Sequence, residues 1–257
     1  EMSKYQFALE LYSVRNELKS DLRGTLKAVA AMGYEGVEFA GGFAHSAQET
    51  ADALREAGLI CCGWHTPWSA VSDAQFEATV AYNKAVGNTR IMIPGLPGEL
   101  TGSLAGWQQA ASQFNALSAR LRERGMTIGY HNHHSEFAPI DGVVPYYYFF
   151  DRTDPSVTVQ IDNGNAMSGG ADVMEIMNRY PGRFDLVHLK PYSRRDGFAT
   201  MIGEDDVPWA EFMAFCRTRG NTAWYIVEYE CETLYTPLDG VDRCLKALRR
   251  MESDGVI

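Results

Sequence analysis

The feature that most constrains the fold of this chain is an alternation of short apolar runs with longer amphipathic segments. The apolar runs have the length of buried β-strands, and a helical period of apolar residues marks the segments between them. Gly33, Gly58, Gly87 and Gly125 each close one helical segment, as glycine often does where a helix ends. The predicted strands cover residues 7–11, 36–39, 59–64, 90–94, the beginning of 128–137, 157–162, 184–190 and 224–228.

Eight strands that alternate with eight helices in 257 residues, with no linker or low-complexity break, predict one α/β domain. The preferred architecture is a single (β/α)8 TIM barrel over residues 1–257. The alternative is an open, doubly wound sheet, which should carry a glycine-rich phosphate loop after its first strand. The segment in that place, Tyr12-Ser13-Val14-Arg15-Asn16, is no such loop, so the barrel is favoured.

Charge and cysteine content argue against several classes of function. A net charge of −10 without any Lys/Arg run disfavours a nucleic-acid partner or an anionic membrane surface. No apolar run approaches the ~20 residues of a membrane span, and residues 1–5 contain no apolar signal segment. The five cysteines are odd in number and lack zinc-type spacing, which favours core residues in a reducing compartment. We therefore expect a cytoplasmic protein with a small-molecule partner, and a homo-oligomer remains open.

One stretch carries an unusual density of imidazoles. Residues 128–137 read Ile-Gly-Tyr-His-Asn-His-His-Ser-Glu-Phe, so three of the six histidines and a glutamate follow a short apolar strand. Alternation along the strand places His131 and His133 on one face. Imidazoles and carboxylates at the end of a strand suit a transition metal or proton transfer near neutral pH.

Metal-binding or acid–base side chains stand at the carboxyl ends of six of the eight predicted strands, where the active sites of such barrels lie. In chain order they are Glu38, His65, then His131, His133 and Glu136, then Asp162, His188 with Lys190, and Glu228. These nitrogen and oxygen donors favour a divalent Mn²⁺, Co²⁺, Zn²⁺ or Fe²⁺ ion over Ca²⁺. Without cysteine donors, an open catalytic site is favoured over a closed structural zinc site.

Such an ion can hold the carbonyl and a neighbouring hydroxyl of a sugar. It then stabilises the enediolate that forms when a base removes the proton between them. The predicted function is therefore that of a metal-dependent carbohydrate enzyme that abstracts a proton next to a metal-bound carbonyl.

Five motifs resemble the xylose-isomerase-like TIM-barrel superfamily of sugar isomerases and epimerases. They are Val37-Glu38-Phe39, Tyr130-His131-Asn132-His133, Gln160-Ile161-Asp162, Val187-His188-Leu189-Lys190 and Ile226-Val227-Glu228. Each motif is short, but together their order and strand positions span nearly the whole chain.

The resemblance implies a single divalent metal held by Glu, Asp, His and Glu from four strand ends. It places Asp162, His188 and Glu228 in the last three of these positions. The first position departs from the family pattern, because the fifth strand has no glutamate before Glu136.

The replacement at the fifth strand bears on the reaction. We expect His133 to be the ligand, because it is nearer the strand end, and His131 to be the base; either His131 or Glu136 is the alternative ligand. A two-glutamate epimerase would pair Glu228 with a glutamate on this strand. A histidine base resembles superfamily members that eliminate water or an aglycone from a keto-sugar, such as inosose dehydratases and 3-keto-glycoside lyases. We therefore predict an isomerase or epimerase, with a dehydratase or lyase as the alternative and Glu136 and Glu228 as further catalytic candidates.

The remaining candidates are expected to contact substrate. Lys190 should share the face of its strand with His188 and bind a substrate oxygen in a catalytic role. Glu38 and His65 are expected to bind substrate hydroxyls, and Trp68 is expected to form an apolar wall for a sugar face.

Two other functional classes compete with this prediction. An endonuclease that shares the barrel would need further histidine ligands and a basic DNA-binding face, which the acidic composition disfavours. A barrel that binds sugar without catalysis should have lost part of its ligand set, whereas Asp162, His188 and Glu228 are all present.

Overall fold

The predicted alternation of strands and helices is present in the computed structural model, which describes residues 3–257. Residues 1 and 2 lie outside the described residues, so the structure does not test the prediction that residues 1–5 contain no apolar signal segment. The strands are β1 (Phe7–Glu10), β2 (Gly36–Ala40), β3 (Ile60–His65), β4 (Arg90–Ile93), β5 (Thr127–His131), β6 (Thr158–Gln160), β7 (Leu186–Leu189) and β8 (Trp224–Val227). The α-helices are α1 (Arg15–Ser20), α2 (Leu22–Met32), α3 (Ala47–Ala57), α4 (Phe76–Ala85), α5 (Gly98–Thr101), α6 (Leu104–Arg122), α7 (Pro145–Phe150), α8 (Asn163–Ser168), α9 (Val173–Arg179), α10 (Trp209–Phe215) and α11 (Pro237–Ser253). Three 3-10 turns, η1 (Leu11–Val14), η2 (Trp68–Val71) and η3 (Ser135–Phe137), and one π-helical turn, η4 (Cys216–Gly220), complete the described elements.

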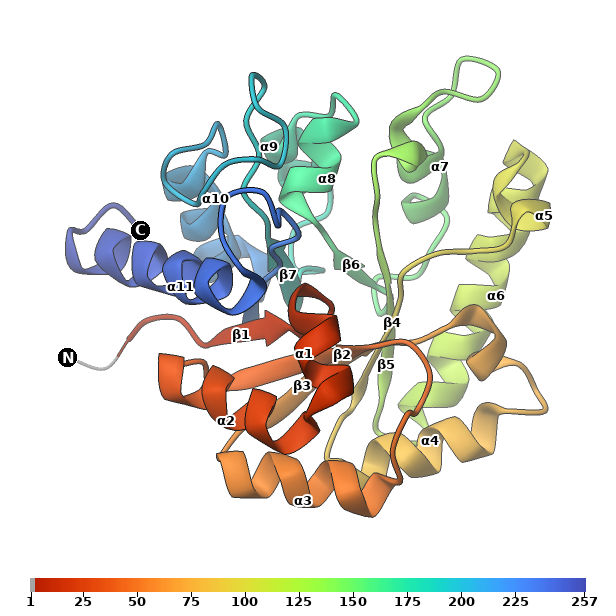
Figure 1. Ribbon diagram of the computed structural model, residues 1–257. Coiled ribbons are helices and arrows are strands. Elements are labelled where there is room, and N and C mark those ends of the chain that lie inside the picture. The colour runs from red at the N-terminus through yellow and green to blue at the C-terminus, as the bar shows by residue number, and fades with distance from the viewer. Residues whose placement is uncertain (1–2) are drawn as a thin grey trace.

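The eight strands form one parallel sheet that closes on itself, with helices on its outer side (Figure 1). The strand order is β6-β5-β4-β3-β2-β1-β8-β7, so β6 and β7 are the two edges that must meet. They meet where Asp162 pairs in parallel with His188, and where the His188 N–H donates to the Ile161 carbonyl at 2.8 Å. The predicted (β/α)8 barrel is therefore confirmed, and its closing seam lies beside two predicted metal ligands.

Local sequence explains where the longer helices begin and end. Asp21 accepts a hydrogen bond from the first turn of α2, and Ser46 and Glu49 form a capping box on α3. Both helices end at glycines with positive φ, Gly33 at 106° and Gly58 at 72°. The short helices α1, α5 and α8 were not predicted, because helices of four to six residues are too short to show an apolar stripe.

The longer helices are amphipathic. In α11, for example, Val241, Leu245 and Leu248 are buried, while the opposite face is rich in charged residues. Among residues 3–257, no helix combines the length and the apolar character that crossing a membrane requires.

Two layers of side chains fill the barrel. The apolar layer contains Ala8, Cys62, Met92, Leu186, Trp224 and Ile226. Toward the carboxyl ends of the strands the inward-facing side chains become carboxylates and imidazoles. Gly63 of β3 leaves room for this polar layer, because a Cβ at that position would lie only 2.5 Å from the Glu38 Oε2 atom. The polar layer thus rests on an apolar floor.

Candidate active site

Four strands, β5 to β8, each deliver one candidate metal ligand to the same place. His131, Asp162, His188 and Glu228 each contribute one donor atom, and these atoms lie within 4.8 Å of one another. The His131 Nε2 atom lies 3.7 Å from Asp162 Oδ2 and 4.0 Å from Glu228 Oε2. The His188 Nδ1 atom lies 3.8 Å from the same Asp162 oxygen and 2.8 Å from Glu228 Oε2. Because these residues surround the closing seam of the barrel, we call them the seam group.

The seam group has the chemistry of a divalent-metal site. Within residues 3–257, Asp162 Oδ2 is buried without a hydrogen-bond partner, while Oδ1 accepts from the Asn165 N–H at 2.7 Å. Leaving a buried carboxylate oxygen unpaired costs free energy, which a cation at this position would offset. Tetrahedral ligands with bonds of about 2.1 Å lie roughly 3.4 Å apart, close to most of the separations given above. Two imidazole nitrogens and two carboxylate oxygens therefore fit a divalent transition metal.

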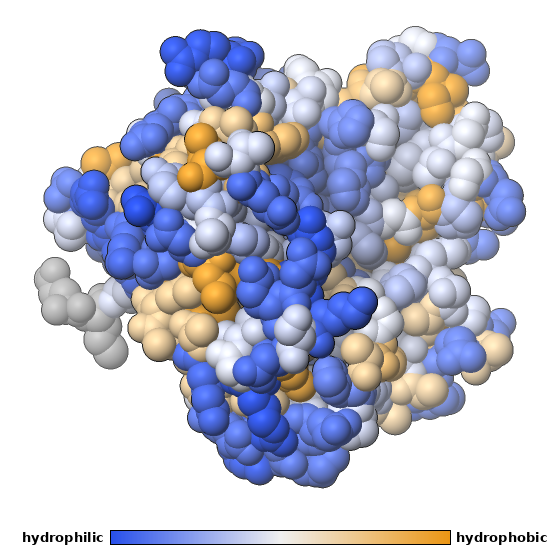
Figure 2. Space-filling model, in the orientation of Figure 1, coloured by the Kyte–Doolittle hydropathy of each residue, from blue (hydrophilic) through white to orange (hydrophobic). Residues whose placement is uncertain are grey.

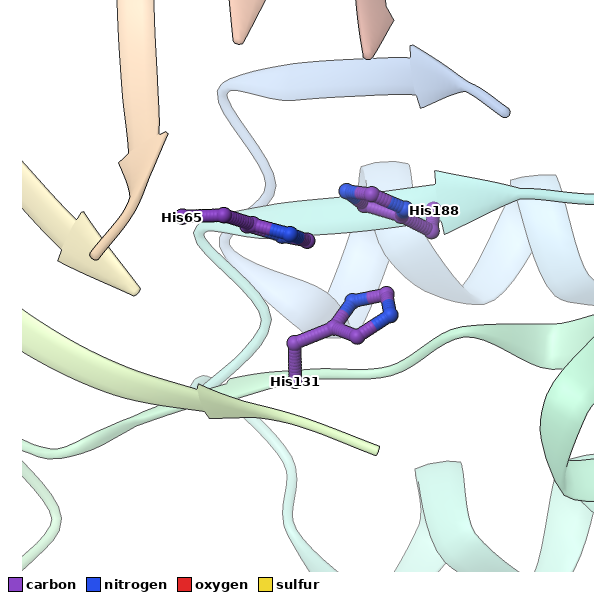
Figure 3. A group of neighbouring side chains, drawn as sticks. All are labelled: His65, His131 and His188. Carbon is purple, nitrogen blue, oxygen red and sulfur yellow. The ribbon is translucent and has the colours of Figure 1, made fainter. Parts of the chain in front are cut away.

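A second cluster of buried polar residues lies directly behind the seam group. It consists of Glu10, Glu38, His65 and His188, so His188 belongs to both clusters. We call this second cluster the inner group. The imidazoles of His65 and His188 lie parallel, with ring centroids 5.1 Å apart, and the His131 ring lies across from both (Figure 3).

Hydrogen bonds connect the members of the inner group. The His188 Nε2–H donates to Glu38 Oε1 at 2.5 Å, and the Gln160 amide donates to Glu38 Oε2 at 2.8 Å. The Gln160 carbonyl oxygen in turn accepts from His65 Nε2 at 2.8 Å. His188 therefore presents Nδ1 to the seam group and is held from behind by a carboxylate, as metal-binding histidines commonly are.

Burial and neighbouring charge give the two seam imidazoles different proton affinities. Burial, together with His188 and His65, lowers the pKa of His131 well below its usual range, so this imidazole is neutral and has a free lone pair. Burial alone would also lower the pKa of His188, but the Glu38 and Glu228 carboxylates outweigh it and raise that pKa to about 10.

The pKa values of the carboxyl groups in the seam and inner groups are also shifted in opposite directions. Burial raises the pKa of Asp162 to about 7, with Glu228 adding to the rise and Lys190 opposing it. Burial would raise the pKa of Glu228 too, but Lys190 and His188 hold it well below its usual range. Burial and then the charge of Glu38 raise the pKa of Glu10 well above its usual range. Four carboxyl groups are crowded into this buried region, and a bound cation would favour the ionised forms of Asp162 and Glu10, whose pKa values burial raises.

Lys190 is a buried ammonium group at the edge of the seam group. Its Nζ atom donates to Glu230 at 2.5 Å and to Asn165 Oδ1 at 3.2 Å. It lies 4.0 Å from Asp162 Oδ2 and 3.9 Å from Glu228 Oε1. Burial would lower the pKa of Lys190, but the three carboxylates outweigh it and raise that pKa, so the amine stays charged.

At the fifth strand, the structure brings His131 rather than His133 into the seam group. The His131 side chain is almost fully buried, whereas 49% of the His133 side chain is exposed and its ring centroid lies 5.3 Å from that of His131. The physical reason is that β5 ends at His131, and the chain turns outward into η3 directly afterwards. The geometry therefore places His131, where the sequence analysis expected His133, among the four clustered donors.

Glu136 is buried in the same loop and does not reach the seam group. It accepts hydrogen bonds from the Tyr130 hydroxyl at 2.6 Å, from the His133 backbone N–H at 3.0 Å and from the Ser135 hydroxyl at 3.1 Å. Its carboxylate thus fixes the loop that carries His133, and its position supports neither a ligand nor a catalytic role.

The predicted substrate contacts lie in different places. Glu38 and His65 do reach the site, but Glu38 is fully buried and its oxygens are bonded to His188 and Gln160, so it lies behind the site. Trp68 lies elsewhere: its ring stacks on Phe114 of α6, with centroids 5.4 Å apart and planes at 11°. A tryptophan held flat against a helix in this way does not form a wall of the seam group.

Three residues of the site were missed by the sequence analysis. Glu10 is the last residue of β1 and points inward like Ala8, two positions before it, so strand alternation would have found it. Gln160 and Asn165 carry uncharged amides, which a search for charged strand ends overlooks. Gln160 joins His65 to Glu38, and Asn165 contacts Lys190.

Comparison with known proteins supports the same assignment of fold. Residues 26–251 match the family model of the xylose isomerase-like TIM barrel. An inosose dehydratase from Lacticaseibacillus casei is 27% identical over 146 residues, which cover 48% of this chain and 47% of that protein. The chain thus spans about half the length of the curated relatives it matches.

Solved structures extend the similarity over the whole chain. A crystal structure of a sugar phosphate isomerase/epimerase from Parabacteroides distasonis superimposes with a TM-score of 0.82 at 20% identity, covering 100% of this chain and 96% of that one. The probable 3-DHS dehydratase from Bacillus anthracis gives a TM-score of 0.71 at 16% identity, covering 95% and 98%. At these identities the superpositions show the fold alone. Because the family model covers most of the chain, this protein belongs to the xylose isomerase-like TIM barrel family.

Proposed function

We propose that this protein is a divalent-metal-dependent lyase that acts on a keto-sugar or inosose. It removes the proton from the carbon next to the carbonyl and expels water or an aglycone from the carbon beyond. In this step a C–H bond and a C–O bond break, and a C=C bond forms between the two carbons. The observation that carries the proposal is the seam group, with two imidazoles and two carboxylates brought together at the carboxyl ends of four strands.

The seam group would hold the ion through His131 Nε2, His188 Nδ1 and the carboxylates of Asp162 and Glu228. When bound, a divalent ion polarises a carbonyl and lowers the cost of removing the neighbouring proton. Mn²⁺, Co²⁺, Zn²⁺ and Fe²⁺ all accept this donor set.

His133 is our candidate for the proton-transferring residue. Burial lowers the pKa of His133, so its imidazole is neutral at pH 7 and can accept a proton. Its ring lies beside His131 at the strand mouth, and Glu136 fixes its backbone. The half-exposed ring remains accessible to a substrate that reaches the seam group.

Lys190 is our candidate for binding the substrate oxygen on which negative charge develops. Its ammonium group is buried, charged and within 4.0 Å of seam-group carboxylates. A fixed positive charge in a site of low dielectric stabilises such an oxygen more strongly than it would in water. Asn165 and Glu230 hold the ammonium in place.

Two observations favour elimination over isomerisation. The proteins with detectable sequence similarity are named inosose dehydratases, whereas the isomerase/epimerase name comes from a match of fold alone. A two-glutamate epimerase needs a glutamate base on the fifth strand, and Glu136 is engaged in fixing its loop. Sugar isomerisation or epimerisation, which shares the first proton transfer, is the second candidate.

The proposal is tested with purified protein, a panel of inososes and keto-sugars, and metal analysis. We expect about one transition-metal ion per chain and formation of an unsaturated product that absorbs in the ultraviolet. In D₂O, an isomerase or epimerase would return substrate or product with solvent deuterium and no unsaturation. A protein that binds no ion and is not activated by added Mn²⁺ or Co²⁺ would contradict the metal-dependent mechanism.

A further inference from the structure

A cavity beside the seam group suggests which kind of substrate this site accepts. It has a volume of about 350 Å³ and lies between the loop that follows β4 and the loop that follows β5. Both loops stand at the carboxyl ends of their strands, near α5 and α7 (Figure 1). His133 lines this cavity and also packs against His131 of the seam group. The cavity therefore adjoins the site described above, with His133 between the two.

The walls of the cavity are mainly apolar. Leu96 comes from the first loop, Trp107 from α6, Pro139 and Ile140 from the second loop, and Pro145 from the start of α7. Val143, farther along this second loop, is an exposed hydrophobic residue, and Figure 2 shows several hydrophobic areas on this side of the molecule. Rigid proline and aromatic surfaces bind flat apolar groups with little loss of conformational entropy.

The polar groups in the walls are already bonded to one another. The Tyr130 hydroxyl and the Ser135 hydroxyl both donate to Glu136, and the Trp107 indole N–H donates to the Thr101 carbonyl at 3.2 Å. A ligand rich in hydroxyl groups would have to break these bonds or leave its own hydroxyls unpaired. The cavity thus favours an apolar ligand over a second sugar.

The size of the cavity limits the ligand to one or two rings. A cavity of roughly 150 Å³ is sufficient for benzene, and small-molecule pockets begin near 300 Å³. We propose that the cavity is a subsite for an aromatic aglycone, so that the substrate is a keto-glycoside of a phenol. This inference rests on the proposed lyase function. The aglycone lies on the His133 side of the sugar. The C–O bond to the aglycone breaks, and the proton removed from carbon is passed to the aglycone oxygen, so that the aglycone leaves as a phenol.

The test compares two probes on the metal-loaded protein, methyl 3-keto-β-glucoside and 4-nitrophenyl 3-keto-β-glucoside. Because 4-nitrophenolate is a far better leaving group than methoxide, kcat/KM is compared between the parent and the variant for each probe, and not between the two probes. Leu96→Trp should fill the cavity and lower kcat/KM at least tenfold for the aryl probe, with a change below threefold for the methyl probe. Ile60→Trp, on the exposed start of β3, is the control and should alter neither value.

Other outcomes separate the inference from the proposed function. Equal losses on both probes in Leu96→Trp, or a preference of the parent protein for 3-keto-cellobiose over the aryl probe, would overturn the subsite. If no probe turns over, the lyase assignment fails, and binding is then measured by calorimetry with 4-nitrophenyl β-glucoside. If Leu96→Trp weakens this binding tenfold while Leu96→Ala retains it, the result supports the subsite without the lyase function. If Leu96→Trp leaves the binding unchanged, the result refutes the subsite.

Discussion

The seam group and the inner group share His188 and contain the same two residue types, yet they differ in how their donors are used. In the seam group, His131 and Asp162 face each other at 3.7 Å without a hydrogen bond. In the inner group, Glu38 is bonded to His188 at 2.5 Å and to Gln160 at 2.8 Å. In the seam group His188 Nδ1 and Glu228 Oε2 are hydrogen-bonded at 2.8 Å, but Asp162 Oδ2 and His131 Nε2 have no hydrogen bond to another member of the group. In the inner group Glu38 uses both of its carboxylate oxygens, and only Glu10 Oε2 is left unpaired within the described part of the chain.

This difference explains why composition alone does not identify a metal site. A buried carboxylate and imidazole stabilise each other when they are hydrogen-bonded, and they attract a cation when they are not. The inner group still serves the seam group, because Glu38 fixes the orientation of the shared His188. We therefore propose that the seam group binds the metal and that the inner group orients the shared His188.

The strongest test of this division replaces one carboxylate in each group by its amide. Asp162→Asn keeps the oxygen that caps α8 but places an amide NH₂ where Oδ2 faces the other donors. We expect loss of the bound ion and a fall in kcat of about 10³-fold or more, because a metal supplies several kcal/mol of charge stabilisation. Metal content by mass spectrometry and turnover of the best substrate are the measurements.

Glu10→Gln is the matched control for Asp162→Asn. Glu10 is equally buried, and its Oε2 atom lies 3.9 Å from His188 Nε2, but it belongs only to the inner group. We expect this variant to keep its ion, and a chelator should lower its melting temperature as it does in the parent protein. Asp162→Asn should be insensitive to the chelator. If Glu10→Gln lost the ion and Asp162→Asn kept it, the assignment of the two groups would be reversed.

A second test separates the two histidines of the fifth strand. His131→Ala removes a donor of the seam group, so we expect metal content to fall below a tenth of the parent value. His133→Ala should keep the ion but lose 10²- to 10⁴-fold in turnover and in solvent-deuterium exchange, the usual contribution of a general base. The opposite pattern, with the ion lost only in His133→Ala, would restore the assignment made from sequence.

A third and smaller effect is expected for Glu38→Gln. The amide keeps a hydrogen-bonding oxygen but removes the charge that holds His188 from behind. Mutations of such supporting carboxylates typically weaken metal binding 10- to 100-fold. We expect a loss of that size in Co²⁺ affinity, with a shift in the visible Co²⁺ spectrum and unchanged far-ultraviolet circular dichroism. An unaltered affinity and spectrum would show that Glu38 does not orient a metal ligand.

The sequence was sufficient to predict the barrel and three of the clustered donors, those that follow regular strands. Asp162, His188 and Glu228 lie at or just after regular strands, where period-two alternation fixes which side chains point inward. The fifth strand was harder, because alternation gives His131 and His133 the same face and cannot show that the chain leaves the sheet at His131. Contacts between distant strands, such as that of Gln160 with Glu38, leave no local pattern.

The smallest effect on catalysis is expected at Trp68. The sequence analysis predicted that this residue contacts the sugar, but it lies in η2, beyond the end of β3. Its ring stacks on Phe114, in a groove between η2 and α6, away from both groups. Trp68→Ala should leave metal content unchanged and kcat/KM within about twofold. It should lower the free energy of unfolding by about 1–3 kcal/mol, because an aromatic pair and part of its buried area are lost. Denaturant titration and steady-state kinetics on the same preparation check both values. A tenfold rise in KM at unchanged stability would place Trp68 against the substrate, and the boundary of the site would then have to include η2.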